Sequence, residues 1–458
     1  MAKRHEIDIT TGSIPKKVLQ FAVPLLLSSF LHVLYHSADT IVVGRFAGST
    51  PMAAVGSTGS LVMLIVNLFT GLTAGTNVMT ARYYGSKEYN KVSEYVHASI
   101  ALSMVLGLML GVIGFFLSTP LLRLMHVDNA VLPLSSLYLK LYFLGTPLSL
   151  VYQFSTSILR ALGDTKRPLY FSAISGLANI LLNVVFVVVF HMSVAGVALA
   201  TVISQGLSCF MALYTLVKTD GPHKLSFRKL QLHKEPVKDI IRIGLPVGLN
   251  STVFNFANVT IQSAINSLGA VAMAGDAAAR TLDGLIASSM SAFYAAAAPF
   301  VSQNIGAKRY DRLGKVIRSC MLMSSVTAVL FSGGMRLLGR PLLGLFVAAD
   351  DPTRDAVISA GLIRLTVVAL PYFLCGIMDV AAGALRGMGR SWTPFLISII
   401  GTCAVRIGWV ALVFSRFQSA EMLYLCFPVS WFITMVVTIG FMLPQLRKTK
   451  KQGQVLQA

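Results

Sequence analysis

The chain has 458 residues, of which 55% are hydrophobic and only 12% are charged, and its mean hydropathy is +0.71. This composition is too apolar for a water-soluble protein of that length, so it predicts an all-α integral membrane protein. The net charge of +20 would suit nucleic acid, but most of the 38 Lys and Arg residues lie between apolar segments, and we expect no nucleic-acid partner.

Apolar stretches long enough to cross a bilayer recur along the chain. The first has no small-residue cleavage site, so we interpret it as a retained span and not as a signal peptide. Windows of about 20 apolar residues predict twelve spans, near residues 17–43, 52–80, 95–118, 132–155, 169–190, 194–217, 240–267, 280–303, 315–338, 357–383, 393–415 and 420–443. Lys and Arg gather in alternate loops and near both ends, which predicts a multi-pass plasma-membrane protein with both termini cytoplasmic.

The sequence repeats its own landmarks once, in the same order. The repeated pairs are Gly85 and Gly306, Lys87 and Lys308, Tyr89 and Tyr310, Pro24 and Pro246, Pro147 and Pro371, and the loops Arg160-Ala161-Leu162-Gly163 and Arg386-Gly387-Met388-Gly389. We therefore predict an N-lobe at residues 1–217, a cytoplasmic linker at 218–239 and a C-lobe at 240–458, with six spans per lobe around a central cleft. Two homologous membrane halves with a site between them are typical of a secondary transporter.

Two carboxylates, Asp39 in the first predicted span and Asp379 in the tenth, stand out among the acidic residues because their positions do not suit a loop or a helix end. A charge at mid-bilayer costs at least about 2.5 to 3.5 kcal/mol, so such residues face a bundle interior or a wet cavity and are functional candidates. We expect the other acidic residues in loops or at helix ends. His32 and His36 share one helix face with Asp39, which indicates a polar surface there. The alternative is that Asp39 caps an outer helix end.

Three polar residues of the fifth and sixth spans complement Asp39, namely Asn179, Asn183 and Thr201. Their oxygen atoms could form a cluster suited to Na⁺, or a hydrogen-bond network around a protonated aspartate. The same residue types also join membrane helices without any transport role. We expect no other metal site, because the two histidines lack a third ligand and the five cysteines show no CxxC spacing.

The second half has no counterpart of Asp39, because Ile261 occupies the equivalent position. The seventh span instead carries amides, which bind substrate groups but do not titrate. We therefore predict ion coupling in the N-lobe and a cavity wall in the C-lobe. Candidate residues of the substrate cavity are His36, Gln153, Asn255, Asn258, Gln262 and Asp379.

Two candidates keep alternative interpretations. Asp379 binds an ion or substrate, or it is a structural partner of Arg406 in the next span. Pro24 removes a backbone hydrogen bond from the first span and is a bending point, or it is a tolerated proline without a dynamic role.

These residues resemble the multidrug and toxic compound extrusion family, in the segment Ser37-Ala38-Asp39-Thr40-Ile41-Val42-Val43-Gly44 and in both Arg-x-x-Gly loops with the prolines that follow them, Pro168 and Pro394. The resemblance extends from Pro24 to about Pro444. It implies two six-helix lobes that exchange H⁺ or Na⁺ for amphipathic, often cationic compounds. It also implies that Asp39 is the coupling acid, that Asn179, Asn183 and Thr201 are its partners, and that Pro24 bends.

The sequence thus predicts a monomeric bacterial cation/drug antiporter that works by alternating access and contacts membrane lipid. H⁺ or Na⁺ is its coupling ion and it needs no cofactor. The main rival is a flippase for a lipid-linked saccharide or peptidoglycan precursor, which would need a wide cavity lined by Arg or Lys. An enzyme is not expected, because the chain has neither GxSxG nor HExxH.

Overall fold

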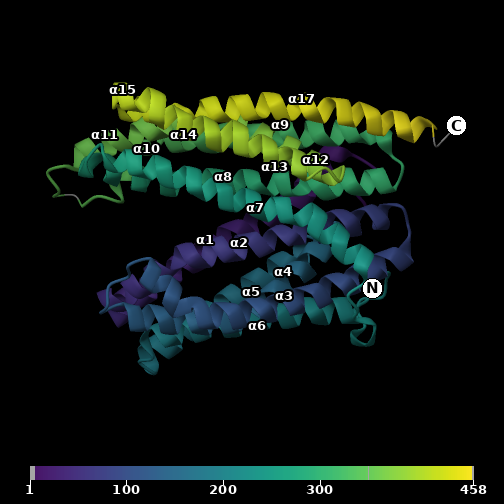
Figure 1. The fold of residues 1–458 in the computed structure, drawn as a ribbon, viewed down its shortest axis with the longest axis horizontal. Coiled ribbons are helices and arrows are strands. Elements are labelled where there is room, and N and C mark those ends of the chain that lie inside the picture. Colours follow the sequence, from purple (N-terminus) through teal and green to yellow (C-terminus); the bar gives the residue numbers. More distant parts are fainter. Residues whose placement is uncertain (1–5, 349, 456–458) are drawn as a thin grey trace. The chain divides into compact units, whose positions relative to one another are not determined.

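The computed structural model describes residues 6–348 and 350–455, and in this part of the chain helices joined by short loops are the regular structure (Figure 1). The predicted all-α class is confirmed. The chain divides into two compact units. Unit 1 comprises the residues through Asp8 together with Leu27–Gly248, and unit 2 comprises Ile9–Leu26 and Leu249–Ala458.

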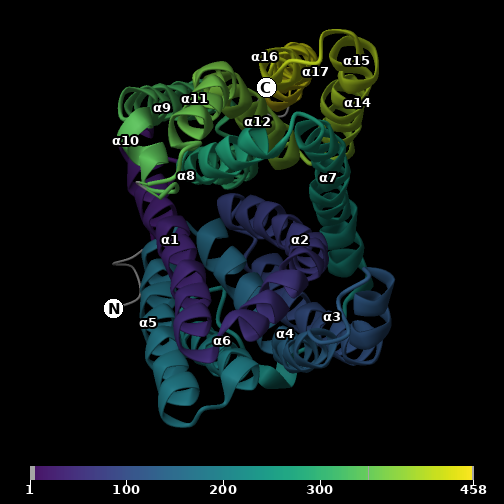
Figure 2. The same ribbon diagram turned by 90° about the vertical axis from the view of Figure 1, so that its left-hand side faces the viewer.

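Unit 1 is built mainly from five long helices and the ends of two others. Its elements are the Leu27–Val42 part of α1 (Ile14–Val42), the π-helical turn η2 (Val43–Ala47), α2 (Ser49–Gly85), α3 (Tyr89–Leu124), α4 (Leu132–Ala161), α5 (Lys166–Asn183), the π-helical turn η3 (Val184–Val189), α6 (Ser193–Lys218), the short 3₁₀ turn η4 (Phe227–Lys229) and the first part of α7 (Lys234–Asn266). Helix α4 packs against α2, α3 and α6, and α5 packs against α6 (Figure 2).

Unit 2 has more helix breaks. It contains the first part of α1, the second part of α7, α8 (Ala270–Gly306), α9 (Tyr310–Leu337), α10 (Gly339–Gly344), α11 (Arg354–Arg364), η5 (Leu365–Ala369), α12 (Tyr372–Gly387), α13 (Trp392–Ser398), η6 (Ile399–Ala404), α14 (Val405–Trp409), η7 (Val410–Phe414), α15 (Ser415–Phe417), α16 (Ala420–Tyr424) and α17 (Cys426–Val455). Helix α8 packs against α9, α11 and α12, and α12 also packs against α17.

Ten helices of the described residues are long and apolar enough to cross a membrane, and a bent pair raises the number to eleven. The bent pair is Arg354–Ala369 and Tyr372–Gly387, which meet at 41°. We predicted one continuous span there, and Pro371 at the break cannot donate the backbone hydrogen bond that would continue the helix. Helix α7 is the remaining predicted span, and its polar residues keep it outside the eleven.

Two helices pass from one unit to the other. The boundary in α1 falls between Leu26 and Leu27, and the boundary in α7 falls between Gly248 and Leu249. Each lies within two residues of a proline of the sequence repeat, Pro24 and Pro246. These unit boundaries differ from the lobe boundaries that we predicted from the sequence. The end of the N-lobe at residue 217 and the start of the C-lobe at residue 240 stay predictions.

The repeat is visible in the backbone. Lys87 and Lys308 both adopt a left-handed conformation, with φ of 60° and 56°, and Gly163 and Gly389 do so with φ of 91° and 83°. Each residue ends a helix, and the following amide donates to the carbonyl five residues back, as Asp164 does to Leu159 at 2.9 Å. This is the Schellman ending, for which glycine is the usual residue. The corresponding loops of the two halves therefore share their local geometry.

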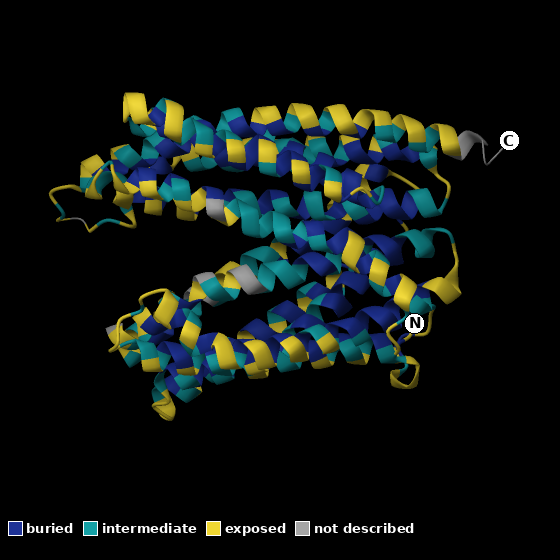
Figure 3. Ribbon diagram, in the orientation of Figure 1, coloured by how far each residue is buried: buried dark blue, intermediate teal, exposed yellow. Residues whose placement is uncertain are grey.

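Small residues bring α3 and α4 close together. A Cβ at Gly107 would lie 2.6 Å from the Cα of Pro147, so only glycine fits. The opposite face of α3 exposes an apolar stripe formed by Val105, Leu108, Val112 and Phe116. Figure 3 shows this division between buried and exposed faces on the long helices. An exposed apolar stripe of this kind suits contact with lipid chains.

The loop between α6 and α7 holds a buried histidine. His223 is 1% exposed, and its Nε2 lies 3.8 Å from Oε1 of Glu6. Burial, and to a smaller extent the charge of Arg167, lower the pKa of His223 to about 4. The nearby carboxylate of Glu6 does not offset this lowering. His223 is therefore neutral at physiological pH.

Candidate functional site

The first candidate site lies in unit 1, where α1 and α5 meet. The Asn183 side-chain amide donates both to Oδ1 of Asp39 and, at 3.2 Å, to Oδ1 of Asn179. Asn183 is fully buried and Asn179 is 7% exposed. Asp39 and Asn183 are 144 positions apart in the sequence, yet they are hydrogen-bonded. Three residues that we singled out in the sequence therefore form one hydrogen-bonded cluster.

The cluster has an unused acceptor. The Oδ1 of Asn183 is buried and has no hydrogen-bond partner among the described residues. Such an atom carries a desolvation penalty of about 1 to 3 kcal/mol, which a bound cation or a proton donor would relieve. The cluster can therefore present oxygen atoms of Asp39, Asn179 and Asn183 to H⁺ or Na⁺, the hard ligands that such an ion prefers.

Apolar residues and irregular helix turns surround this cluster. Asn183 is the last residue of α5 and stands directly before the π-helical turn η3, and the turn η2 begins four residues after Asp39. Val42, Val43, Val187 and Val197 pack together beside it, and the Tyr138 ring contacts them. Tyr138 is also close enough to Asp39 to interact with its charge. Widened turns of this type occur frequently at functional sites.

The other predicted residues of unit 1 are placed differently. The Thr201 hydroxyl donates to the Val197 carbonyl of its own helix at 2.9 Å, so its role as a partner of Asp39 stays a prediction. Gln153 accepts from the Thr70 hydroxyl at 2.5 Å and thereby joins α4 to α2. The side chain of His36 lies outside the described residues. Pro24 is buried within α1.

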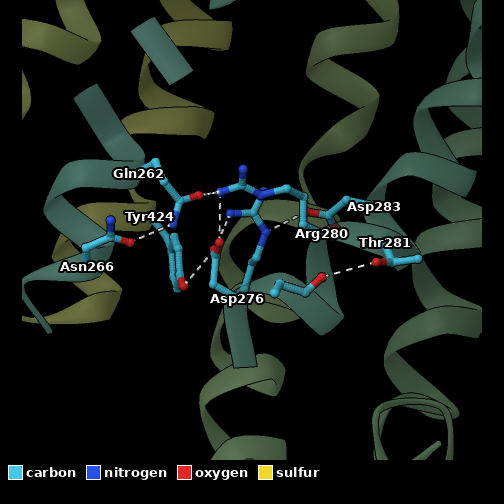
Figure 4. A network of polar contacts seen from close by, with 9 residues as sticks. Gln262, Asn266, Asp276, Arg280, Thr281, Asp283 and Tyr424 are labelled. Atoms are coloured by element: carbon cyan, nitrogen blue, oxygen red, sulfur yellow. Dashed lines mark hydrogen bonds and ion pairs between the residues drawn. The ribbon is translucent and has the colours of Figure 1, made fainter. Parts of the chain in front are cut away.

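The second polar site lies in unit 2 and was missed in the sequence. Arg364 donates to Oδ1 of Asp276 at 2.7 Å and to Oδ2 of Asp283 at 2.8 Å. Arg280 donates to the other oxygen of Asp276 at 2.8 Å, and the Tyr424 hydroxyl donates to Asp276 at 3.0 Å. Figure 4 shows Tyr424 of α16 directed toward Asp276 of α8, and Gln262 of α7 beside Arg280 of α8. The network therefore joins four helical segments of unit 2.

This network corrects the expectation that acidic residues other than Asp39 and Asp379 lie in loops or at helix ends. Asp276 and Asp283 are 1% and 3% exposed, and both lie inside α8. We began the eighth span near residue 280, ten residues too late. A signal was present, since Asp276, Arg280 and Asp283 follow the same i, i+4, i+7 spacing as the residues on the first span.

The predicted amides of α7 lie beside this network. Gln262 accepts from Arg280 at 2.6 Å and donates to Asn266 at 2.9 Å. Asn258 accepts from Nη1 of Arg406 at 3.5 Å, and Asn255 is exposed. Arg406, Asn258, Arg280 and Arg364 line a cavity of about 290 Å³ within unit 2.

Asp379 and Arg406 do not form the structural pair that we considered. The contact of Asp379 is with the Cys375 thiol, whose Sγ lies 3.7 Å from Oδ2. Arg406 instead donates from Nε to the Ser430 hydroxyl at 3.1 Å, and its guanidinium lies 4.4 Å from the centre of the Phe427 ring. The interpretation of Asp379 as an ion or substrate ligand stays a prediction.

The duplicated helical fold, the spans and the polar clusters held within them define a polytopic membrane transporter. The MatE family model matches the chain twice, at residues 24–185 and 246–410, and both matches begin at the prolines paired in the repeat. The chain belongs to this multidrug and toxic compound extrusion family, which is a family of transporters and not of enzymes.

Relatives and solved structures agree with this assignment. The chain is 29% identical to the probable multidrug resistance protein YpnP of Bacillus subtilis, over 88% of this chain and 89% of that protein. It is 23% identical to the multidrug export protein MepA of Staphylococcus aureus, over 84% of each. An outward-facing multidrug resistance MATE transporter shares the fold, with a TM-score of 0.91 and 19% identity over 98% of this chain and all of that one.

Proposed function

We propose that the protein is a secondary active multidrug exporter of the bacterial plasma membrane, which exchanges H⁺ or Na⁺ for amphipathic, mainly cationic compounds. Relatives named as multidrug resistance and multidrug export proteins support the cargo class. The observation that carries the coupling mechanism is the hydrogen bond from Asn183 to Asp39, because it places a carboxylate among buried amides inside a membrane unit. The basic inner loops support a topology with both termini in the cytoplasm.

Neutralisation of Asp39 is the proposed coupling step. The ionised carboxylate accepts the hydrogen bond from Asn183, and a proton or Na⁺ removes most of the charge that makes this bond strong. The amide of Asn183 can then turn its Oδ1 toward the bound ion or the new O–H group. Helix α1 carries Asp39, so a change in this contact alters the fit between α1 and α5.

Pro24 is the position at which we expect α1 to bend in response to this change. It lies within α1 two residues before the chain leaves unit 2, and it lacks the N–H that would continue the hydrogen-bond ladder. A bend at Pro24 would let the part of α1 that carries Asp39 move independently of the part before it. In the proposed cycle, substrate occupies the protein while Asp39 is ionised. Uptake of H⁺ or Na⁺ from outside then expels the substrate, and release of the ion to the inside returns α1 to its starting conformation.

The available energy is sufficient for this exchange. One elementary charge that crosses a potential of 100 mV supplies about 2.3 kcal/mol, which corresponds to a concentration ratio of roughly fiftyfold. A pH gradient or Na⁺ gradient adds to this value.

Dye retention by cells tests the proposal. Cells that express the Asp39→Asn variant should retain an ethidium-like dye that cells with the wild-type protein expel. Asp128→Asn is the matched control, because Asp128 is an exposed loop aspartate whose carboxylate accepts from the nearby Ala130 amide. Equal clearance of dye by the Asp39→Asn variant and the wild type, at equal membrane expression, would refute the assignment.

A flippase for a lipid-linked precursor is the second candidate. The observation in its favour is that three arginines, Arg280, Arg364 and Arg406, line the cavity of unit 2. Two of them are bound to Asp276 and Asp283, which leaves one cation for a pyrophosphate that usually requires several donors. Transbilayer movement of a fluorescent lipid pyrophosphate in liposomes, without any drug transport, would favour this alternative.

A further inference from the structure

The cavity of unit 2 combines aromatic walls with the buried guanidinium of Arg406. Phe254, Tyr372, Phe427 and Trp431 contribute rings to its lining, and Arg406 contributes its guanidinium. The volume of about 290 Å³ is close to the lower end of small-molecule sites, roughly 300 Å³. The cavity therefore suits a flat group of one or two rings.

Arg406 differs from the other arginines of this cavity in its partners. It is 3% exposed, and none of the ion pairs in the described part of the chain includes it. It donates hydrogen bonds to neutral oxygens, those of Ser430 and Asn258. Arg364 and Arg280, by contrast, are each bound to carboxylates. The charge of Arg406 is thus the one in this cavity that lacks an anionic partner.

Aromatic rings compensate only part of the cost of burying this charge. The guanidinium lies 4.4 Å from the Phe427 centroid and 5.9 Å from those of Trp431 and Phe254. A desolvated cation–π contact is worth about 2 kcal/mol, whereas the burial of an unpaired ion costs several. A bound anion would supply the missing partner in a site of low dielectric, where charge-assisted bonds are strong.

We propose that this cavity binds a monoanionic planar aromatic group, with Arg406 holding its carboxylate and the surrounding rings stacking on its face. A single unpaired guanidinium matches one carboxylate, which it can grip with two parallel N–H bonds. Asn258 positions Arg406 through its Oδ1 and leaves its own amide N–H groups for the ligand. The transporter would thus accept carboxylated or zwitterionic aromatic compounds in addition to cations. Only this last step, from bound ligand to cargo, rests on the proposed export function.

Calorimetric titration of the detergent-purified full-length protein tests the site. The probes are 2-naphthoate and its neutral analogue 2-naphthamide, which share size and ring system. We expect the wild-type protein to bind naphthoate at least tenfold more tightly than naphthamide. The Arg406→Gln variant should lose this preference through weaker naphthoate binding, with naphthamide affinity unchanged. Arg406→Lys should keep part of it.

Two further variants separate binding from folding. Asn258→Asp adds a carboxylate 3.5 Å from Arg406 with almost no change in volume, and it should abolish the preference for naphthoate. Arg386→Gln is the control, because Arg386 is also buried and lies 5.3 Å from the ring centre of Tyr294, but it does not line the cavity. Its naphthoate affinity should stay within twofold of the wild type. Apparent Tm values identify any variant that fails to fold.

Three outcomes would overturn the proposal. They are equal affinity of the wild type for the two probes, naphthoate affinity within twofold of the wild type in folded Arg406→Gln or Asn258→Asp, and a loss in Arg386→Gln as large as that in Arg406→Gln. The Asp39→Asn variant should bind naphthoate normally. Failure of the coupling proposal is therefore seen in transport, and failure of the anion site is seen in binding.

Discussion

Removal of Arg364 should destabilise unit 2 far more than removal of its neighbour Arg280. Arg364 is 5% exposed and is bound to both Asp276 and Asp283, whereas the side chain of Arg280 is 45% exposed and is bound to Asp276 alone. In Arg364→Gln the carboxylate of Asp283 loses its ion-pair partner while it remains buried. Deletion of one member of a buried ion pair costs about 3 to 5 kcal/mol, mostly because the other charge is left uncompensated.

The Arg280→Gln variant is the matched comparison. Asp276 still accepts from Arg364 and Tyr424 in this variant, so the loss should be about 1 kcal/mol or less, as for a largely exposed pair. The double variant Arg364→Met/Asp283→Leu should cost less than Arg364→Gln, because it leaves no uncompensated carboxylate at position 283. Asp276 loses Arg364 in both variants but keeps Arg280 and Tyr424.

Apparent melting temperatures of the purified proteins in one detergent measure these differences. For a unit of about 200 residues, 1 kcal/mol corresponds to roughly 2 to 4 °C, so Arg364→Gln should melt at least about 6 °C below the wild type. Arg280→Gln should melt within about 4 °C of it. Equal melting temperatures of Arg364→Gln and Arg280→Gln would refute the reasoning, because burial would then have no influence on the cost of the lost pair.

Three further predictions follow from other parts of the chain. Between pH 6.5 and 4 the unfolded state binds a proton at His223 before the folded state does, so the folding free energy of the wild type should weaken by up to about 3 kcal/mol as the pH falls. The melting temperature of His223→Gln should therefore depend less on pH than that of the wild type. Pro24→Ala restores a backbone donor and should slow dye efflux from liposomes while the dye affinity, measured by fluorescence anisotropy, stays unchanged. Gly107→Leu should destabilise the protein by about 1 to 3 kcal/mol through overpacking against Pro147 and so lower its melting temperature. Gly440→Leu, whose side chain meets nothing within 4 Å at its Cβ, should leave the melting temperature unchanged.

The class of fold and the N-lobe cluster were predictable for a physical reason. A bilayer requires long apolar helices and penalises charge, so spans and the isolated Asp39 stand out against their surroundings. Asn179 and Asn183 stand one turn apart in an otherwise apolar segment, and in the structure Asn183 donates both to Asp39 and to Asn179. The duplication was equally readable, since it recurs as matched helix endings at Lys87 and Lys308.

The network of unit 2 was not predictable in the same way. Asp276 and Arg280 are charged residues one turn apart, and both lower the hydropathy of this stretch. The predicted span therefore began at Arg280 and left Asp276 out, although α8 includes both. The partner Arg364 lies 88 residues from Asp276, and its pairing depends on how α11 packs on α8. The choice between Asp379 and Ser430 as the neighbour of Arg406 likewise depends on packing that one sequence does not specify.

The most direct test of the coupling mechanism is gradient-driven transport by purified protein in liposomes, with a pH gradient or a Na⁺ gradient imposed separately. The wild-type protein should accumulate a cationic dye against the concentration gradient of the dye when one of the two ion gradients, the pH gradient or the Na⁺ gradient, is imposed. The Asp39→Asn variant should bind the dye with similar affinity but fail to accumulate it under either gradient. Undiminished accumulation by the Asp39→Asn variant would contradict the role of Asp39.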